Sequence, residues 1–397
     1  MTERATYVTL VGMVAYAAIA TDLYLPAIPA MVDAFGANEA QGQLTLSIFM
    51  VGMAAGQLLF GPLSDYYGRI PVIAAGTALF VMTSVGCAVA NSMEMMWLAR
   101  LAQGIAAASG PVIARAIVRD SYHGNKAAQV MSMLGAAMAV IPLIAPTIGA
   151  WVIVWFHWRA TFIALAVFGV LILFGLRSFK ESAPAIGQGS IRLLPVLKLF
   201  SACLSNRQFI GFQICGTATY AAILAYLSTV AYFMRDVFAL PTAYFGYAFA
   251  ASVSGFMAGA LLCSRLVMYL GMHRVMTLGL TLSLLAAISQ RALAPAGLDN
   301  AWGLAVSSCL IFFGIGLTSA NAAMGAVSLF PRSAGAASAV YGFLHSVIAA
   351  LVGFLAGIYY DGSLIPTANI MLVCGVIGLL GLPLTTEPPS PSRSAST

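Results

Sequence analysis

Residues 21–26 read TDLYLP and place one carboxylate, that of Asp22, inside an apolar run that begins near Tyr7 and continues past Pro29. A charge at the centre of a bilayer costs about 2.5 to 3.5 kcal/mol on insertion scales, and such a residue usually faces a cavity or a partner. A structural hydrogen bond to a neighbouring helix is the alternative role. Because structural contacts rarely need a full charge in lipid, we expect Asp22 to be functional.

The composition around this stretch is that of an integral membrane protein. The chain has 397 residues, of which 61% are hydrophobic and 8% are charged, whereas soluble domains carry about 25% charged residues. A membrane-spanning helix needs about 20 mostly apolar residues, and no barrel-type alternation is present. The sequence therefore predicts an all-α membrane protein with twelve spans, at residues 6–34, 43–63, 71–90, 94–117, 127–150, 159–177, 207–234, 244–268, 274–293, 301–328, 336–359 and 366–384.

Most lysines and arginines fall on one side of these predicted spans. With an even number of spans both termini lie on that same side, which the positive-inside rule makes cytoplasmic. We therefore expect a multi-pass protein of the inner (cytoplasmic) membrane with both termini in the cytoplasm. The net charge of +6 then reflects topology and contact with anionic lipid headgroups rather than a nucleic-acid partner.

One long connection divides the predicted spans into two sets of six. It is rich in Gly, Ser, Pro and basic residues. The predicted domains are an N-terminal six-helix bundle at 1–177, a cytoplasmic linker at 178–206, a C-terminal six-helix bundle at 207–384 and a disordered tail at 385–397. Two parallel repeats of this kind form a substrate site near the bilayer midplane between the halves.

Residues 61–71, GPLSDYYGRIP, form the turn between the second and third spans. Its glycines permit a tight turn, and Asp65 can accept hydrogen bonds from a helix N-terminus. The stretch resembles the signature loop of the major facilitator superfamily, although Tyr66 and Ile70 stand where that loop usually has basic residues. Of the charged positions of that loop, only Asp65 and Arg69 are matched here. The resemblance implies a fold of two six-helix parallel repeats.

Residues 100–104, RLAQG, lie inside the fourth span and resemble a second signature, found in the superfamily's drug exporters. A rise of about 1.5 Å per residue puts Arg100 and Asp22 at similar depths in the outer half of the membrane. We expect the two to pair, so that Arg100 stabilises the ionised carboxylate. The alternative is that Arg100 snorkels to the outer headgroups.

The fifth span contains Gly135, Pro142, Pro146 and Gly149. Two prolines four residues apart predict a kinked helix, and the small residues permit close approach of another helix. The pattern resembles the antiporter motif, which within the superfamily accompanies export rather than uptake. Small residues with prolines are also common in membrane helices generally.

Residues 22–29, DLYLPAIP, and 115–120, RAIVRD, narrow the resemblance to the bicyclomycin and chloramphenicol resistance (Bcr/CflA) family of drug:proton antiporters. The resemblance covers nearly the whole chain in helix count and order, and its motifs lie within residues 22–149. It implies a proton-coupled secondary active exporter of amphipathic small molecules such as drugs, which works by alternating access of two rocking halves. Asp22 would then release and take up the coupled proton, and Arg100 would tune the pKa of Asp22.

Arg115 and Arg119 lie one helical turn apart at the cytoplasmic end of the fourth span and share a face. They either fix the orientation of this span, as basic residues on the cytoplasmic side, or form a cytoplasmic gate with Asp65, Arg69 and Asp120.

Candidates for the substrate cavity are polar and aromatic residues in otherwise apolar spans. Such residues are often packing rather than ligand contacts, and a lone membrane histidine often only bonds a neighbour. The candidates are Tyr16, Tyr24, Gln57, Gln103, Tyr220, Tyr226, Asn321, Tyr341 and His345.

The sequence shows no metal-binding cluster, nucleotide-binding loop or nucleophilic triad, so we expect no enzyme, no cofactor and no metal. The expected partners are a small-molecule substrate, protons and membrane lipid, and we expect a monomer, although no sequence feature determines the oligomeric state. Two rival functions remain open: a transporter dedicated to one metabolite or siderophore, by export or uptake, and a non-transporting receptor or facilitative pore.

Overall fold

The computed structural model describes residues 3–177, 179–183, 200–241, 244–293 and 301–386. Most of the predicted linker and the tail beyond residue 386 lie outside these described residues. Within them the regular structure is helical, and twelve helices are long and apolar enough to cross a membrane. This confirms the predicted all-α fold with twelve spans.

The N-terminal half, residues 3–177, contains the first six spans. Its helices are α1 (Glu3–Asp22), the short η1 (Leu25–Ala27), α2 (Ile28–Phe35), α3 (Glu39–Tyr67), α4 (Arg69–Ala88), α5 (Met93–Ala107), α6 (Ser109–Ser121), α7 (Gly124–Trp155) and α8 (Trp158–Leu176).

The C-terminal half, residues 207–384, contains the other six. Its helices are α10 (Arg207–Tyr232), the π-helical turn η2 (Phe233–Val237), α11 (Phe245–Leu270), α12 (Met272–Leu293), α13 (Ala301–Ser328), η5 (Pro331–Ser333), α14 (Ala334–Ile358), α15 (Ile365–Gly381) and η6 (Leu382–Leu384).

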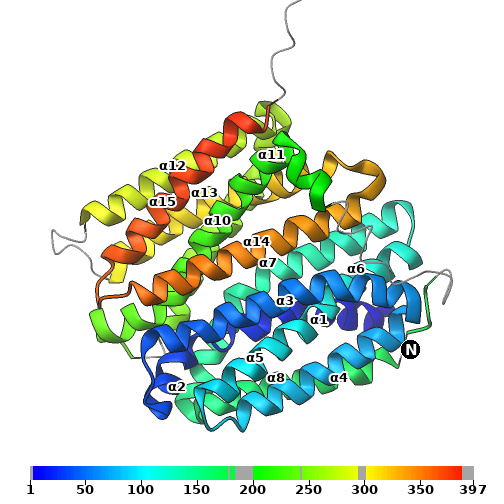
Figure 1. The fold of residues 1–397 in the computed structure, drawn as a ribbon, viewed down its shortest axis with the longest axis horizontal. Helices are drawn as coiled ribbons and strands as arrows, with labels where there is room; N and C mark the ends of the chain where they lie inside the picture. Colours follow the sequence, from blue (N-terminus) through cyan, green and yellow to red (C-terminus); the bar gives the residue numbers. More distant parts are fainter. Residues whose placement is uncertain (1–2, 178, 184–199, 242–243, 294–300, 387–397) are drawn as a thin grey trace, which may run out of the picture.

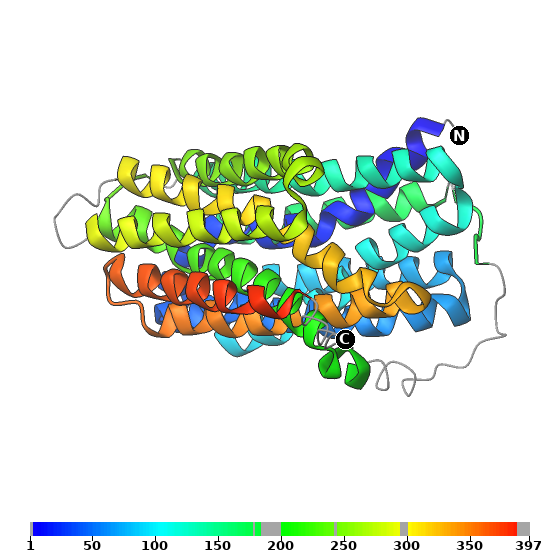
Figure 2. The same ribbon diagram turned by 90° about the horizontal axis from the view of Figure 1, so that it is seen from above.

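The two halves lie side by side, and their long helices run in roughly the same direction (Figures 1 and 2). The contacts between the halves are made mainly by α3 against α14 and by α7 against α11. We call the side where α1 begins and α15 ends the terminal face, and the other side the opposite face.

Two of the predicted spans are each divided into two helices. The first stops at Asp22 and restarts as a short turn and α2, because Pro26 lacks a backbone N–H and disfavours a helical residue before it. The fourth is divided at Ala108 into α5 and α6, where Pro111 cannot donate to the Ala107 carbonyl. Each divided segment still forms one span, Thr6–Phe35 and Met93–Ser121, in agreement with the spans predicted at 6–34 and 94–117. The breaks inside them were not predicted.

The buried apolar residues are arranged differently at the two faces. Toward the opposite face one core cluster contains residues of both halves, such as Val32 and Tyr232. Toward the terminal face the buried residues form separate clusters, one around Ile73 and Ile117 in the N-terminal half and one around Phe209 in the C-terminal half. The apolar packing that joins the halves is therefore concentrated away from the terminal face.

Candidate functional site

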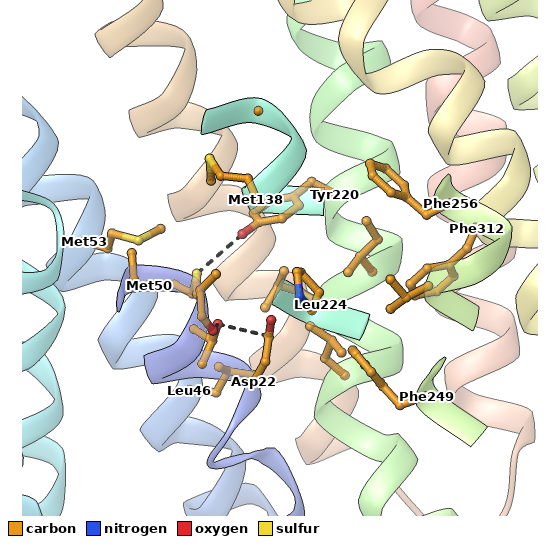
Figure 3. Close-up of a pocket in the computed structure, with 18 residues that line it drawn as sticks. Asp22, Leu46, Met50, Met53, Met138, Tyr220, Leu224, Phe249, Phe256 and Phe312 are labelled. Carbon is orange, nitrogen blue, oxygen red and sulfur yellow. Dashed lines mark hydrogen bonds between the residues drawn. The ribbon is translucent and has the colours of Figure 1, made fainter. Parts of the chain in front are cut away.

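A cavity of about 450 Å³ lies between the two halves (Figure 3). Helices α1, α3 and α7 form its wall on one side, and α10, α11 and α13 form it on the other. The described lining residues are Ala17, Ala18, Thr21, Asp22, Leu46, Met50, Met53, Gly135, Met138, Pro142, Tyr220, Ile223, Leu224, Leu227, Phe249, Val253, Phe256 and Phe312. The wall is almost entirely apolar, which suits the uncharged part of an organic ligand.

Asp22 supplies the one carboxylate among the described lining residues. It is the last residue of α1, directly before the break, and its side chain is 6% exposed. The Thr21 hydroxyl donates a hydrogen bond to Asp22 Oδ1 at 3.0 Å. An unpaired buried carboxylate is costly unless a proton or a cation neutralises it. The site therefore suits a group that exchanges a proton or meets a cationic ligand.

The predicted pair of Asp22 and Arg100 does not form. Arg100 is fully buried, and within the described part of the chain no ion pair joins it to Asp22. Its Nη1 instead donates to the Ala20 carbonyl at 3.1 Å and to Gln103 Oε1 at 2.7 Å. Arg100 reaches the segment just before Asp22, but it is turned toward its own set of partners and does not line the cavity.

Arg100 is held between aromatic rings and backbone carbonyls. Its guanidinium carbon lies 4.4 Å from the ring centre of Tyr24 and 4.2 Å from that of Phe49, a cation–π arrangement. In a continuous helix the Ala20 carbonyl would accept a bond from the N–H of Tyr24. Because α1 ends at Asp22, Arg100 takes the place of that donor and stabilises the break that carries the carboxylate.

The residues of the predicted antiporter motif lie on α7, which continues through both prolines from Gly124 to Trp155. Gly135 and Pro142 line the cavity, and Pro146 is buried. Gly149 packs directly on the backbone of Leu23, at the break after Asp22, and a Cβ added at Gly149 would overlap the Leu23 carbonyl oxygen. The motif thus brings α7 against the segment that positions Asp22.

We expect Gly149→Ala to destabilise the protein and Gly135→Ala to leave it nearly unchanged. The first substitution forces the backbone of α7 away from Leu23, and overpacking of this kind costs about 1 to 3 kcal/mol. The second is a matched control on the same helix, since a Cβ at Gly135 meets nothing within 4 Å. Apparent melting temperatures in detergent test this, and equal melting temperatures for the two variants would contradict it.

Tyr220 is the member of the predicted substrate-cavity set that lines the cavity among the described residues. The candidates of the N-terminal half serve other contacts. Tyr16 bonds Ser109 at 2.5 Å, Tyr24 bonds Thr45, and Gln103 donates to Ser84 at 2.8 Å. Gln57 lies against Gly342 of α14, at the contact between the halves.

The remaining candidates of the C-terminal half are packed inside it. The Tyr226 hydroxyl lies 3.0 Å from that of Ser252, and Asn321 donates to the Leu317 carbonyl at 3.1 Å. Tyr341 and His345 form a stack with Tyr220. The placement of these residues in the cavity wall was therefore wrong for all but Tyr220.

Six of the eighteen described lining residues are methionine or phenylalanine, and the sequence did not single out any of these six. Met50 and Met53 are spaced as one face of α3, and Phe249, Val253 and Phe256 are spaced as one face of α11. This spacing is a detectable signal. It does not say which face of each helix points to the other half.

At the terminal face, Arg69 joins three segments of the N-terminal half. Its side chain is 3% exposed and pairs with Asp65 at 2.5 Å and with Asp120 at 2.9 Å. It also donates to the Ser64 hydroxyl at 2.7 Å. The structure thus brings three of the predicted gate residues together, at the ends of α3, α4 and α6.

The other two arginines of the predicted gate are more exposed. Arg119 Nε lies 3.4 Å from Asp120 Oδ1, and its side chain is 66% exposed. Arg115 is exposed, and none of the described ion pairs includes it. A surface pair of this kind contributes about 0 to 1 kcal/mol, so the buried Arg69 is the centre of the network.

Glu181 completes this network, and sequence reasoning missed it. It follows α8, and its carboxylate accepts from the backbone N–H of Arg69 at 2.8 Å and of Ile70 at 3.0 Å. Gly68, at φ +98°, leaves no room there for a side chain, because a Cβ would lie 2.7 Å from Glu181 Oε2. Glu181 therefore caps the N-terminus of α4, where the helix dipole favours a carboxylate.

We expect this cap to be lost in acid. Partial burial acts to raise the pKa of Glu181, but bonds from the N–H groups of Ala183, Arg69, Ile70 and Ser182 hold it below the ordinary 4.5. A lowered pKa means that the stabilisation is complete above pH 4.5 and is lost as the pH falls through the lowered value. Hydrogen-exchange protection of the Arg69 and Ile70 amides should fall over that range.

The same protection should fall at neutral pH in Glu181→Gln, whereas Lys180→Gln, at the neighbouring exposed position, should leave it intact. Unchanged protection in Glu181→Gln would refute the cap.

Comparison with known proteins agrees with this architecture. A model of the Major Facilitator Superfamily matches residues 9–354. The multidrug resistance protein MdtL of Escherichia coli is 28% identical over 367 residues, which cover 90% of this chain and 90% of that protein. A bicyclomycin resistance protein homolog of Haemophilus influenzae is 25% identical over 364 residues, with the same coverage of each chain.

The family match extends from α1 into α14 and includes every helix that lines the cavity. The chain belongs to the major facilitator superfamily, and it is a membrane transporter rather than an enzyme.

Proposed function

We propose that this transporter is a proton-coupled exporter of amphipathic small molecules, in the inner membrane, with both termini in the cytoplasm. The observation that carries the proposal is the single carboxylate of Asp22 in the apolar cavity between the halves. The names of the relatives, a multidrug resistance protein and a bicyclomycin resistance homolog, support drugs as the substrate class.

The distribution of charge supports the orientation. Arg69, Arg119 and Arg207 lie at helix ends on the terminal face, and basic residues favour the cytoplasmic side. The core shared by both halves lies toward the opposite face. Together these features support a state in which the halves are closed on the outside and the cavity faces the cytoplasm.

The coupling step follows from the chemistry of the carboxyl group. The apolar wall takes up the uncharged part of a substrate, and Asp22 either carries a proton or is charged. Proton release to the cytoplasm in the inward-facing state and proton uptake in the outward-facing state give the two conformations different stabilities. A ligand or proton with such differential affinity shifts the equilibrium between them, which links inward proton movement to export.

Purified protein in proteoliposomes tests the proposal. Ethidium, an amphipathic dye, should move against its gradient when a pH gradient is imposed, and its movement should carry protons in the other direction. Dye flux that does not depend on the pH gradient would instead favour a facilitative pore. Absence of flux for ethidium, chloramphenicol and bicyclomycin would favour the transporter dedicated to one metabolite.

A further inference from the structure

Three rings form a column next to the cavity, in the C-terminal half. The ring centres of Tyr220 on α10 and His345 on α14 lie 4.3 Å apart with an interplanar angle of 11°. His345 and Tyr341 follow at 5.4 Å and 26°. Tyr220 is the cavity end of the column, since it is the ring among the three that lines the wall.

Tyr220 reaches from the C-terminal half to the N-terminal half. Its hydroxyl donates to Met50 Sδ on α3 at 3.7 Å. Figure 3 shows this contact, with Tyr220, Met50 and Asp22 around the same cavity. The orientation of the Tyr220 ring therefore decides where the wall presents a hydroxyl near the carboxylate.

The other end of the column is fixed by α10. The Tyr341 hydroxyl fits against the backbone of Gly216, where a Cβ would overlap it. Gln213 Nε2 donates to the Tyr341 carbonyl at 3.4 Å. Tyr341 is thus anchored at its ring and at its backbone, and it gives His345 a stable surface to stack on.

His345 itself is held by its ring faces. Among the residues that the structure describes, none forms a hydrogen bond to His345 Nδ1. Stacking with two flanking rings is the contact that remains, and offset or parallel aromatic pairs stabilise each other beyond their buried area. The aromatic face of His345, rather than its Nδ1, is therefore the part that Tyr220 and Tyr341 contact.

We propose that His345 is a positioning residue, which holds the Tyr220 ring in the cavity wall and so sets the affinity of the cavity for its ligand. The statement about ligand affinity rests on the proposed function, whereas the statement about the ring does not. His345 acts through Tyr220 and needs no contact with the transported compound.

The position of the ring is measured without any ligand. In protein labelled with ¹³C at the methionine methyl groups, the Met50 signal, assigned with Met50→Leu, reports the ring of Tyr220 next to it. His345→Ala should shift this signal in the same direction as Tyr220→Ala. His345→Phe keeps an aromatic face and should return the signal toward its position in the unsubstituted protein. An unmoved Met50 signal in a folded His345→Ala protein would overturn the proposal.

Transport kinetics of ethidium provide the second readout. His345→Ala should raise KM by roughly three- to tenfold with a smaller change in kcat, and His345→Phe should recover most of this loss. If His345→Phe lost transport as fully as His345→Ala, the imidazole nitrogen atoms would be required and the proposal would be wrong. If the unsubstituted protein moved no ethidium, the proposed function would fail for that dye, and the Met50 signal would still decide the role of His345.

Discussion

Asp22→Asn is expected to abolish proton-coupled transport while leaving the fold intact. The amide oxygen of asparagine can still accept the hydrogen bond that Thr21 donates to Asp22 at 3.0 Å, but an amide cannot release a proton. Substrate-driven proton movement in proteoliposomes should fall by roughly tenfold or more, which corresponds to at least about 1.4 kcal/mol. The reason is that the described wall holds no second carboxylate.

The matched control is Asp361→Asn. Asp361 is exposed in the connection before α15 and accepts bonds from Ser363 at 2.9 and 2.7 Å. The chemical change is the same, but the position lies outside the cavity, so coupling should persist. Full coupling in a folded Asp22→Asn protein would show that the proton is carried elsewhere.

Arg100→Leu is expected to destabilise the protein strongly. It removes the donors to the carbonyls of Ala20 and Thr45 and to Gln103, and it removes the cation from between two rings. Bonds from a charged donor contribute about 1.5 to 3 kcal/mol each, and a buried acceptor left unsatisfied carries its own cost. Part of this loss of stability is offset, because the variant no longer carries the cost of burying the Arg100 charge. We expect a net loss of roughly 2 to 4 kcal/mol.

Arg159→Leu is the matched control for the same substitution. Arg159 also donates to one carbonyl, that of Ala90, at 3.1 Å and lies 4.3 Å from the ring centre of Trp158, but it is only partly buried. Its loss should cost about 1 kcal/mol or less. Apparent melting temperatures in detergent compare the two, and similar decreases would mean that Arg100 does not hold the break after Asp22.

The contrast between Asp22 and Arg100 shows where sequence reasoning stops. Helical rise gives the position of each residue along its helix, and Arg100 does reach the Ala20 carbonyl, two residues before Asp22. Whether two side chains meet depends also on the rotation of each helix about its axis, which packing against distant segments sets. Here the break after Asp22 exposes the Ala20 carbonyl, and that acceptor turns Arg100 away from Asp22.

The cavity wall and the cap at Glu181 depend on tertiary structure in the same way. Met50 on α3 and Phe256 on α11 are ordinary apolar residues of membrane helices, and only the approach of the two halves makes them neighbours in one wall. Glu181 is far in sequence from Arg69 and Ile70, and only the folded chain brings its carboxylate to their N–H groups.

By itself, the sequence determined the membrane class, the twelve spans and Asp22 as the carboxylate of interest, because these follow from local composition and the cost of charge in lipid. Tertiary structure alone decided that Asp22 forms no ion pair with Arg100, that Tyr220 faces the cavity and that Glu181 caps α4. Each of these depends on how helices distant in sequence are rotated and packed, which no local pattern encodes.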